Sequence, residues 1–360
     1  MERRATKSAW AILLCVVCVA LVGLVERSTN AETAGRVVEI EFAPIEADES
    51  DDTRTLRSLR RVADDVYSIT YVGDYRARLE DLNDQIIEHG IMHVIEGGSG
   101  RSDCSIFAAA GDAARPIFGR NLDNYTRRAI LVGKFEPPDG YSSIAMMNLA
   151  DMGFGPDDDL MQFAIEDRAK LLNCVLFVTD GMNEKGVAVA LASIDPQRVV
   201  RDETKRLVNL SYLQREILDF AATLDEAIEI IVSRDVVDMD NHTLSHHLLI
   251  ADASGQSAVA EYRGGQWRIL RPDRPWQIAT NTLLFDVSES LVRLLCERYR
   301  VADDYLEGVD GVATWQMGME ILDLMSEERT QWSSIYDLAS RSLYLATHRD
   351  DSTILTTLLR

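Results

Sequence analysis

The sequence has few of the residues and motifs that mark metal, cofactor or nucleic-acid sites. Only 6 of its 360 residues are His and 5 are Cys, and no H-E-x-x-H or Cys/His spacing typical of a metal site is present. Gly97, Gly98 and Gly100 lack the spacing of a phosphate-binding loop. We therefore expect no cofactor and no metal. With 21 Gly and 8 Pro the chain is not collagen-like or low in complexity, but has the composition of a globular protein.

Basic residues are also scarce. Lys+Arg number 37 against 59 Asp+Glu, which gives a formal net charge of -22. A charge of this sign repels phosphate backbones, so we expect no nucleic acid among the partners. The balance says nothing about which uncharged substrate the protein binds.

One long apolar run lies at the N-terminus, over residues 9–25, after Arg3, Arg4 and Lys7. Small residues at 29–31 follow it, so residues 1–31 are predicted to be a signal peptide. A retained signal anchor is the alternative, because the run has the minimum length for spanning a bilayer. Either way we expect export, secreted or periplasmic, with membrane contact only through this segment if it is not cleaved. The rest of the chain then carries a net charge of -24, because the segment has four basic and two acidic residues.

Three cysteines remain beyond this segment, at positions 104, 174 and 296. They are too few and too far apart for a disulfide framework, and at most one pair could form. Cys174 and Cys296 have apolar neighbours and are interpreted as buried side chains. Cys104 instead follows a glycine-rich break and opens a predicted strand.

Composition and pattern divide the exported chain at this break. Residues 32–103 are predicted to be a pro-segment or small subunit, with an acidic flexible spacer at 46–52 and a helical region at 56–96. Residues 104–360 are predicted to be the catalytic domain. Strands, then helices, then strands again indicate an α+β fold. Expected strands are 105–110, 116–122, 129–135, 141–147, 175–179, 187–192, 247–251, 256–262 and 266–270, and expected helices 157–173, 207–222, one from 223, and 288–306.

Cys104 is the candidate nucleophile. If the bond before it is cut, the new α-amino group lies beside the thiol, and its reference pKa of roughly 7.7–8.0 suits a general base. The simpler interpretation is a small buried hydrophobic residue. Arg120 and Asp123 end the next strand, where a guanidinium could favour the thiolate and a carboxylate could hold the amine. Their simpler interpretation is an ion pair at a strand end.

Two further residues follow from pattern. In the predicted helix 288–306, Arg298 lies within the stripe of Leu291, Leu295, Ala302, Tyr305 and Leu306. A guanidinium there needs a buried partner, either in a structural ion pair or in an active site. The loop 180–186 is interpreted as a hairpin turn, whose outgoing strand ends at Ser193.

Taken in order, these segments resemble the choloylglycine hydrolase group of N-terminal nucleophile hydrolases, which includes bile-salt hydrolases, penicillin V acylases and acid ceramidase relatives. The similarity covers roughly residues 67–346. It is carried by C-S-I-F at 104–107, F-G-R-N-L-D at 118–123, P-P-D-G-Y at 137–141, D-G-M-N-E-K-G at 180–186, A-T-N at 279–281 and E-R-Y at 297–299.

The resemblance implies a four-layer αββα sandwich and a role for each matching residue. Cys104 would be the nucleophile and, through its amine, the base, while Arg120 and Asp123 would stabilise the thiolate and orient the amine. Asn281 would donate into the oxyanion hole, and Arg298 would complete the charge network. Ser193 stands where relatives carry Asn or Tyr and is a tentative oxyanion residue; a backbone N–H is the alternative donor.

The resemblance further implies a cysteine amidohydrolase, activated by autoproteolysis at Asp103–Cys104, that cleaves a linear non-peptide amide through a thioester. The processed chains are expected to stay associated, and a homo-oligomer is left open. The expected partner is a small-molecule N-acyl amide. Two alternatives remain: an acyltransferase using the same thioester, and a non-catalytic lipid- or bile-acid-binding protein on the same fold.

Overall fold

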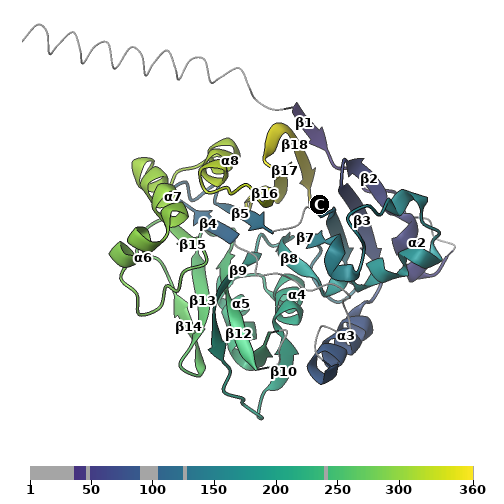
Figure 1. Cartoon of the computed structure of the whole chain (residues 1–360), viewed down its shortest axis with the longest axis horizontal. Coiled ribbons are helices and arrows are strands. Elements are labelled where there is room, and N and C mark those ends of the chain that lie inside the picture. The colour runs from purple at the N-terminus through teal and green to yellow at the C-terminus, as the bar shows by residue number, and fades with distance from the viewer. Residues whose placement is uncertain (1–35, 46–48, 90–103, 125–127, 239–241, 360) are drawn as a thin grey trace, which may run out of the picture.

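The computed structural model describes residues 36–45, 49–89, 104–124, 128–238 and 242–359. Two sheets stack face to face, with helices on both outer faces (Figure 1). The first sheet has seven strands in the order β1-β18-β17-β16-β5-β4-β15. Their bounds are β1 (Arg36–Glu39), β4 (Cys104–Ala109), β5 (Ile117–Asp123), β15 (Trp276–Ala279), β16 (Thr330–Asp337), β17 (Ser342–Thr347) and β18 (Asp350–Leu358).

The second sheet has nine strands in the order β14-β13-β12-β9-β8-β7-β6-β3-β2. Their bounds are β2 (Arg60–Ala63), β3 (Val66–Val72), β6 (Ile130–Glu136), β7 (Ser143–Asn148), β8 (Val178–Asn183), β9 (Ala188–Arg198), β12 (Thr243–Ala251), β13 (Ser257–Arg263) and β14 (Gln266–Leu270). A separate parallel pair is formed by β10 (Arg206–Asn209) and β11 (Arg234–Val237).

The helices form the two outer layers. Those that contact the seven-stranded sheet are α7 (Glu297–Gly308) and α8 (Trp315–Leu324), with α6 (Glu289–Leu295) packed on α7. The nine-stranded sheet is covered by α2 (Asp51–Arg57), α4 (Leu210–Phe220) and α5 (Leu224–Ser233), and α3 (Arg76–His89) packs on β10. Within the described residues, the 3₁₀ helices are η3 (Leu149–Met152), η4 (Leu160–Gln162) and η5 (Glu166–Val175).

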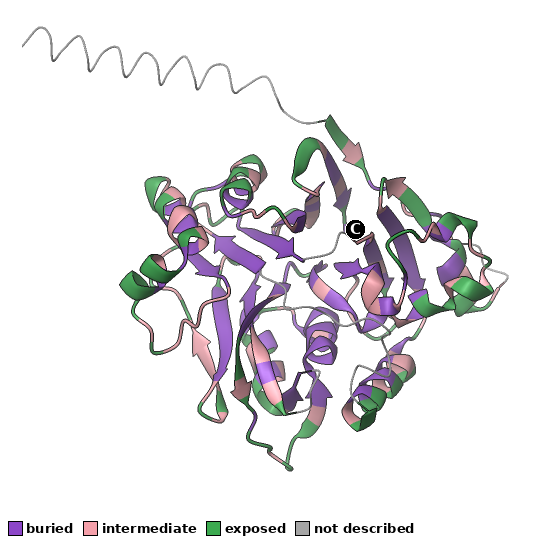
Figure 2. Cartoon of the chain, in the orientation of Figure 1, coloured by how far each residue is buried: buried purple, intermediate pink, exposed green. Residues whose placement is uncertain are grey.

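Alternating side chains build a core on each face of the sheets. Along β4, Ile106 and Ala108 join the core between the sheets, whereas Phe107 and Ala109 join the core under α6–α8. A third core fills the space between the nine-stranded sheet and its helices. Strands buried on both faces are expected only inside a layered sandwich, and β4, β5 and β7 are buried at every residue (Figure 2). The predicted αββα architecture is confirmed.

The expectations for the N-terminal region need correction. The acidic stretch is not wholly a spacer, because α2 begins at Asp51, where the Ser50 side chain accepts from the N–H of Thr53 and caps the helix. The helical region expected at 56–96 contains β2 and β3, whose β-branched and aromatic residues favour a strand. Residues 90–103, including the predicted cleavage site at Asp103, lie outside the described residues.

Three helix predictions are also adjusted. The segment 157–173 forms 3₁₀ turns rather than one α-helix, and 207–222 begins with a strand. The helix expected at 288–306 is broken at Cys296, which has extended backbone between α6 and α7. The break exposes Leu291 and Leu295, which were expected on the apolar face, while Ala302 and Leu306 are buried.

Cys104, Cys174 and Cys296 form no disulfide. Burial raises the pKa of Cys174 to about 12, so this thiol stays neutral. No helix in the described ranges combines the length and the apolar character needed to cross a membrane. The predicted signal segment, residues 1–31, falls outside those ranges.

Candidate active site

Cys104 is the first residue of β4, in the interior of the seven-stranded sheet, and its side chain contributes to the core between the sheets. Arg120 pairs with Ile106 across β4 and β5. Since residues two apart share a face, Arg120 lies on the same face as Cys104. Its Nη2 donates to Cys104 Sγ over 3.3 Å. A guanidinium in this position stabilises the thiolate.

Asp180 holds Arg120 from the opposite sheet. It lies in β8, fully buried, and its Oδ1 is 2.8 Å from Arg120 Nη1. Burial alone would lower the pKa of Arg120, but Cys104 and Asp180 outweigh this effect, and the pKa stays above its usual value. Arg120 is therefore a permanent cation between the thiol and a carboxylate.

The Asp180 carboxylate is saturated with further donors from β16. Its Oδ2 accepts from the Ser334 hydroxyl at 2.9 Å and from the Tyr336 hydroxyl at 2.7 Å. Its Oδ1 also accepts from Trp332 Nε1 at 3.3 Å. These hydrogen bonds replace the water that burial removes from the carboxylate. The sequence interpretation of 180–186 as a hairpin was right for the turn, where Gly186 has φ +81°, but missed this role of Asp180.

Asn281 faces the backbone nitrogen of Cys104. The β15–β4 register pairs Ala279 with Ile106, and continuing it brings Asn281 opposite Cys104. Asn281 Oδ1 accepts from the Cys104 N–H at 2.9 Å, and Asn281 Nδ2 donates to the Ser193 carbonyl at 2.8 Å. The Cys104 nitrogen, which the predicted cleavage would turn into the α-amine, is thus held by a side chain.

Arg298 ties these groups together from the second residue of α7. Its Nη1 donates to the Cys104 carbonyl at 3.1 Å and to the Ser105 hydroxyl at 3.0 Å, and its Nη2 donates to Asn281 Oδ1 at 2.8 Å. It also pairs with Asp123 at 3.4 Å and with Glu327 at 3.3 Å. The side chain is 17% exposed and Asp123 is 0% exposed, so the predicted buried partner exists.

Asp123 ends β5, opposite Thr330 of β16. Its Oδ1 accepts from the Thr330 hydroxyl at 2.6 Å and its Oδ2 from Arg298. Burial raises the pKa of Asp123 to about 6, against the opposing effects of Thr330 and Arg298. In this structure the Cys104 N–H donates to Asn281, so orientation of the amine by Asp123 stays a prediction.

Ser193 lies in the middle of β9, which continues to Arg198 instead of ending at Ser193 as expected, and its carbonyl accepts from Asn281. Ala190 and Ala192 point into the core between the sheets, so alternation directs the Ser193 side chain to the opposite face. Its contribution to the site is therefore through the backbone, and a role for its hydroxyl as oxyanion donor stays a prediction.

Sequence reasoning missed Asp180, Thr330 and Glu327. Asp180 has the one usable signal, a carboxylate just before an Asn-Glu-Lys-Gly turn between two apolar strands. Thr330 carries none, because it meets Asp123 only through the pairing of β5 with β16. Glu327 carries none either, because it precedes β16 and meets Arg298 of α7 only in the folded chain. Among the described residues no group of three His, Cys, Asp or Glu side chains is arranged to hold a metal ion.

Comparisons with known protein sequences match parts of this chain. A family model described as acyl-coenzyme A:6-aminopenicillanic acid acyl-transferase matches residues 173–293, about a third of the chain. A penicillin V acylase from Pectobacterium atrosepticum is 30% identical over 118 residues, which cover 30% of this chain and 31% of that protein. The chain thus aligns with about a third of the length of this curated relative.

Two solved structures share the architecture over longer stretches. Penicillin V acylase from Agrobacterium tumefaciens superimposes with a TM-score of 0.51 at 17% identity, covering 68% of this chain and 83% of that one. A conjugated bile acid hydrolase from Clostridium perfringens gives 0.52 at 16% identity, covering 71% and 92%. The chain therefore has the fold of N-terminal nucleophile hydrolases and resembles the choloylglycine hydrolase group, which includes penicillin V acylases and bile-salt hydrolases.

Proposed function

We propose that this chain is a cysteine amidohydrolase, activated by autoproteolysis at Asp103–Cys104, that hydrolyses a linear amide of an N-acyl substrate through a Cys104 thioester. One observation carries the proposal: both reactive atoms of Cys104 are held, Sγ by Arg120 and the backbone nitrogen by Asn281. A buried cysteine that served only packing would need neither contact.

Activation begins with attack of Cys104 Sγ on the carbonyl carbon of residue 103. The peptide C–N bond breaks as the Cys104 nitrogen takes up a proton, which leaves a free amine and a thioester. Water then hydrolyses the thioester, giving a carboxylate at residue 103 and the free thiol. Arg298 supports this step by anchoring the Cys104 carbonyl on the other side of the reacting bond.

Turnover repeats the same chemistry on the substrate. The α-amine of Cys104 accepts the thiol proton as Sγ adds to the amide carbonyl, and returns it to the leaving amine. Water, deprotonated by the same amine, then cleaves the thioester and releases the acid. Asn281 Nδ2 carries two hydrogens, of which one binds the Ser193 carbonyl, and we assign the other to the developing oxyanion.

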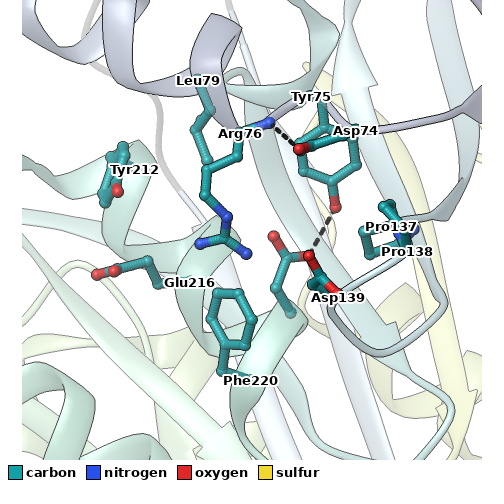
Figure 3. A pocket seen from close by; sticks show the side chains of 11 residues that line it. Asp74, Tyr75, Arg76, Leu79, Pro137, Pro138, Asp139, Tyr212, Glu216 and Phe220 are labelled. Carbon is teal, nitrogen blue, oxygen red and sulfur yellow. Dashed lines mark hydrogen bonds between the residues drawn. The ribbon is translucent and has the colours of Figure 1, made fainter.

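The predicted pro-segment contributes strands to both sheets, which supports association of the processed chains. Its β1 extends the seven-stranded sheet by pairing in parallel with β18, and its β3 pairs in parallel with β6 of the nine-stranded sheet. Side chains add to this contact around a small pocket (Figure 3). Tyr75 donates to Asp219 at 2.7 Å, and the Arg76 guanidinium lies 4.7 Å from the centre of the Phe220 ring.

Intact-mass measurement of the purified exported protein tests activation. We expect fragments 32–103 and 104–360 that co-purify without denaturant. Cys104→Ser should lose amide hydrolysis. Fully active enzyme with an intact Asp103–Cys104 bond, or normal turnover by Cys104→Ala, would overturn the proposal. A panel of conjugated bile acids, penicillin V, acyl-homoserine lactones and N-acyl ethanolamides would identify the acyl group and the amine.

An acyltransferase reaction is the second candidate, favoured by the description of the matching family model. The same thioester would be intercepted by an amine instead of water. Product analysis with and without an added amine separates the two: a new amide at the expense of the free acid indicates transfer. A chain that binds such ligands, yet is unprocessed and unlabelled at Cys104 by an acyl analogue, would indicate a binding protein.

Export through residues 1–31 is part of the proposal. It rests on the apolar run at 9–25 behind three basic residues. N-terminal sequencing of the small chain tests cleavage near residue 31, and a start within residues 1–8 would indicate a retained anchor instead.

A further inference from the structure

The loop that carries Asn281 is hydrogen-bonded to two buried residues of the other sheet, His247 and Glu261. It runs from Thr280 to Phe285, directly after β15. His247 of β12 and Glu261 of β13 pack against it, and both side chains are 0% exposed. They belong to the nine-stranded sheet, whereas β15 belongs to the seven-stranded sheet (Figure 1). The contact therefore joins the two sheets at the candidate active site.

The two residues fix both ends of the loop. His247 Nε2 lies 2.8 Å from the carbonyl oxygen of Thr280, the residue before Asn281. At the other end, the Glu261 carboxylate accepts from the backbone N–H of Leu284 at 2.9 Å and of Phe285 at 3.2 Å. His247 Nδ1 and Glu261 Oε2 are 3.2 Å apart, which links the two anchors.

Hydrogen-bond chemistry sets the charges of the pair. Burial works to raise the pKa of Glu261, but the hydrogen bonds from His247, Leu284 and Phe285 outweigh it and the pKa is lower than usual. Glu261 is thus a carboxylate, so both ring nitrogens of His247 face oxygen acceptors. A buried ion pair contributes little net stability compared with apolar residues of the same volume.

We propose that His247 and Glu261 are positioning residues for Asn281, which fix the 280–285 loop so that the Asn281 carboxamide faces Cys104. The inference rests on the proposed function, because that function gives Asn281 its role. Without the pair, the Asn281 side chain keeps its partners but loses the fixed backbone that aims it. Misplacement of a transition-state donor lowers kcat more than it raises KM.

Glu261→Gln in the full processed protein tests this, because it keeps the shape and removes the charge. We expect kcat to fall by roughly tenfold to hundredfold with KM within about threefold. Alkylation of Cys104 by iodoacetamide should keep its wild-type rate, since Arg120 and Asp180 are untouched. Glu229→Gln, on an exposed residue of α5, is the matched control and should leave all three quantities unchanged.

A double-mutant cycle separates positioning from a general structural effect. If Glu261 acts through Asn281, the Glu261→Gln/Asn281→Ala protein has about the same kcat as Asn281→Ala alone. Additive losses, or a parallel fall in the alkylation rate, would overturn the proposal. If Glu261→Gln does not fold, His247→Gln answers the same question, because the amide retains one donor toward Thr280 and only the link to Glu261 is changed.

Hydrogen–deuterium exchange provides a readout that needs no turnover. Glu261→Gln should speed exchange of the Leu284 and Phe285 amides in the 280–285 segment, and Glu229→Gln should not. Unchanged protection would refute the anchoring. If Glu261→Gln speeds exchange as expected but the wild-type protein hydrolyses no N-acyl amide, the proposed function is overturned and the anchoring of the loop is still supported.

Discussion

Arg120 and Asp180 form an ion pair between the two sheets, with 2.8 Å between Nη1 and Oδ1 and side chains that are 2% and 0% exposed. The other terminal nitrogen of Arg120 donates to Cys104 Sγ. Asp180 thus acts on the thiol through Arg120, and the pair sets the charge around Cys104, the proposed nucleophile.

Asp180→Asn should therefore weaken both stability and thiol reactivity. It leaves Arg120 buried without its counter-charge, and breaking a buried pair in this way costs about 3–5 kcal/mol. Urea unfolding measures the first effect, and the rate of Cys104 alkylation at pH 7 measures the second, which should fall. Asp157→Asn changes an exposed carboxylate and should stay within about 0.5 kcal/mol of wild type. An Asp180→Asn protein matching wild type in both assays would contradict the role of the pair.

The hydrogen-bond partners of Asp180 could not be predicted from the sequence pattern. Its donors Ser334 and Tyr336 lie more than 150 residues further along the chain, in β16, which the sequence analysis did not predict. Local pattern gave the right hairpin, but a saturated buried carboxylate is a property of the sheet stacking. By contrast, Cys104, Arg120 and Asp123 lie on two consecutive antiparallel strands, so short-range spacing was enough to bring them together.

Arg298 has the buried partner that the sequence predicts, although the helix expected around it is not continuous. The expected single helix is broken at Cys296, and Leu295 of its supposed apolar face is 65% exposed. The charge argument depended only on burial near residue 298, where Ala302 and Leu306 of α7 do face the core. Asp123 is the buried partner that the argument required. The apolar periodicity of residues 288–306 is continuous across Cys296 and so contains no sign of this break.

Arg298→Lys should impair the enzyme although it keeps the charge. The guanidinium reaches the Cys104 carbonyl, Asn281 and Asp123 at once, and an ammonium cannot reproduce this planar arrangement. We expect kcat to fall roughly 10²-fold, measured on protein whose processing is verified by intact mass. Arg300→Lys, two residues along α7 and 43% exposed, is the matched control. Equal activities of the two variants would argue against a role of Arg298 beyond its charge.

Asp123 should make folding stability depend on pH. Its folded pKa is about 6, raised by burial from 3.8. A raised pKa means that the folded state favours the protonated form, so this contribution is complete below about pH 4 and is lost as pH rises through 6. The loss is on the order of 3 kcal/mol, since one pKa unit corresponds to about 1.4 kcal/mol.

Asp123→Asn isolates this effect, because the amide cannot titrate. Between pH 4.5 and 7, the unfolding free energy of wild type should fall by about 2 kcal/mol more than that of Asp123→Asn. Asp151, whose burial also raises its pKa to about 6, serves as a second titrating site, so Asp151→Asn should remove a separate part of the dependence. Identical pH profiles of wild type and Asp123→Asn would show that Asp123 does not titrate in this range.

Gly119, next to Arg120 in β5, should not tolerate a side chain. It pairs with Phe107 on one side and Ile335 on the other. A Cβ there would overlap the Phe107 ring and lie 2.8 Å from Ile335 Cδ1, in the core beneath α8. Gly119→Ala should therefore destabilise the fold by about 1–3 kcal/mol, as overpacking does elsewhere, and slow processing by displacing Arg120.

Gly308→Ala is the matched control, because a Cβ at this exposed end of α7 meets nothing within 4 Å. It should be neutral or stabilise the fold by up to about 1 kcal/mol. Equal unfolding free energies for the two variants would contradict the tight packing around Gly119 between β4 and β16.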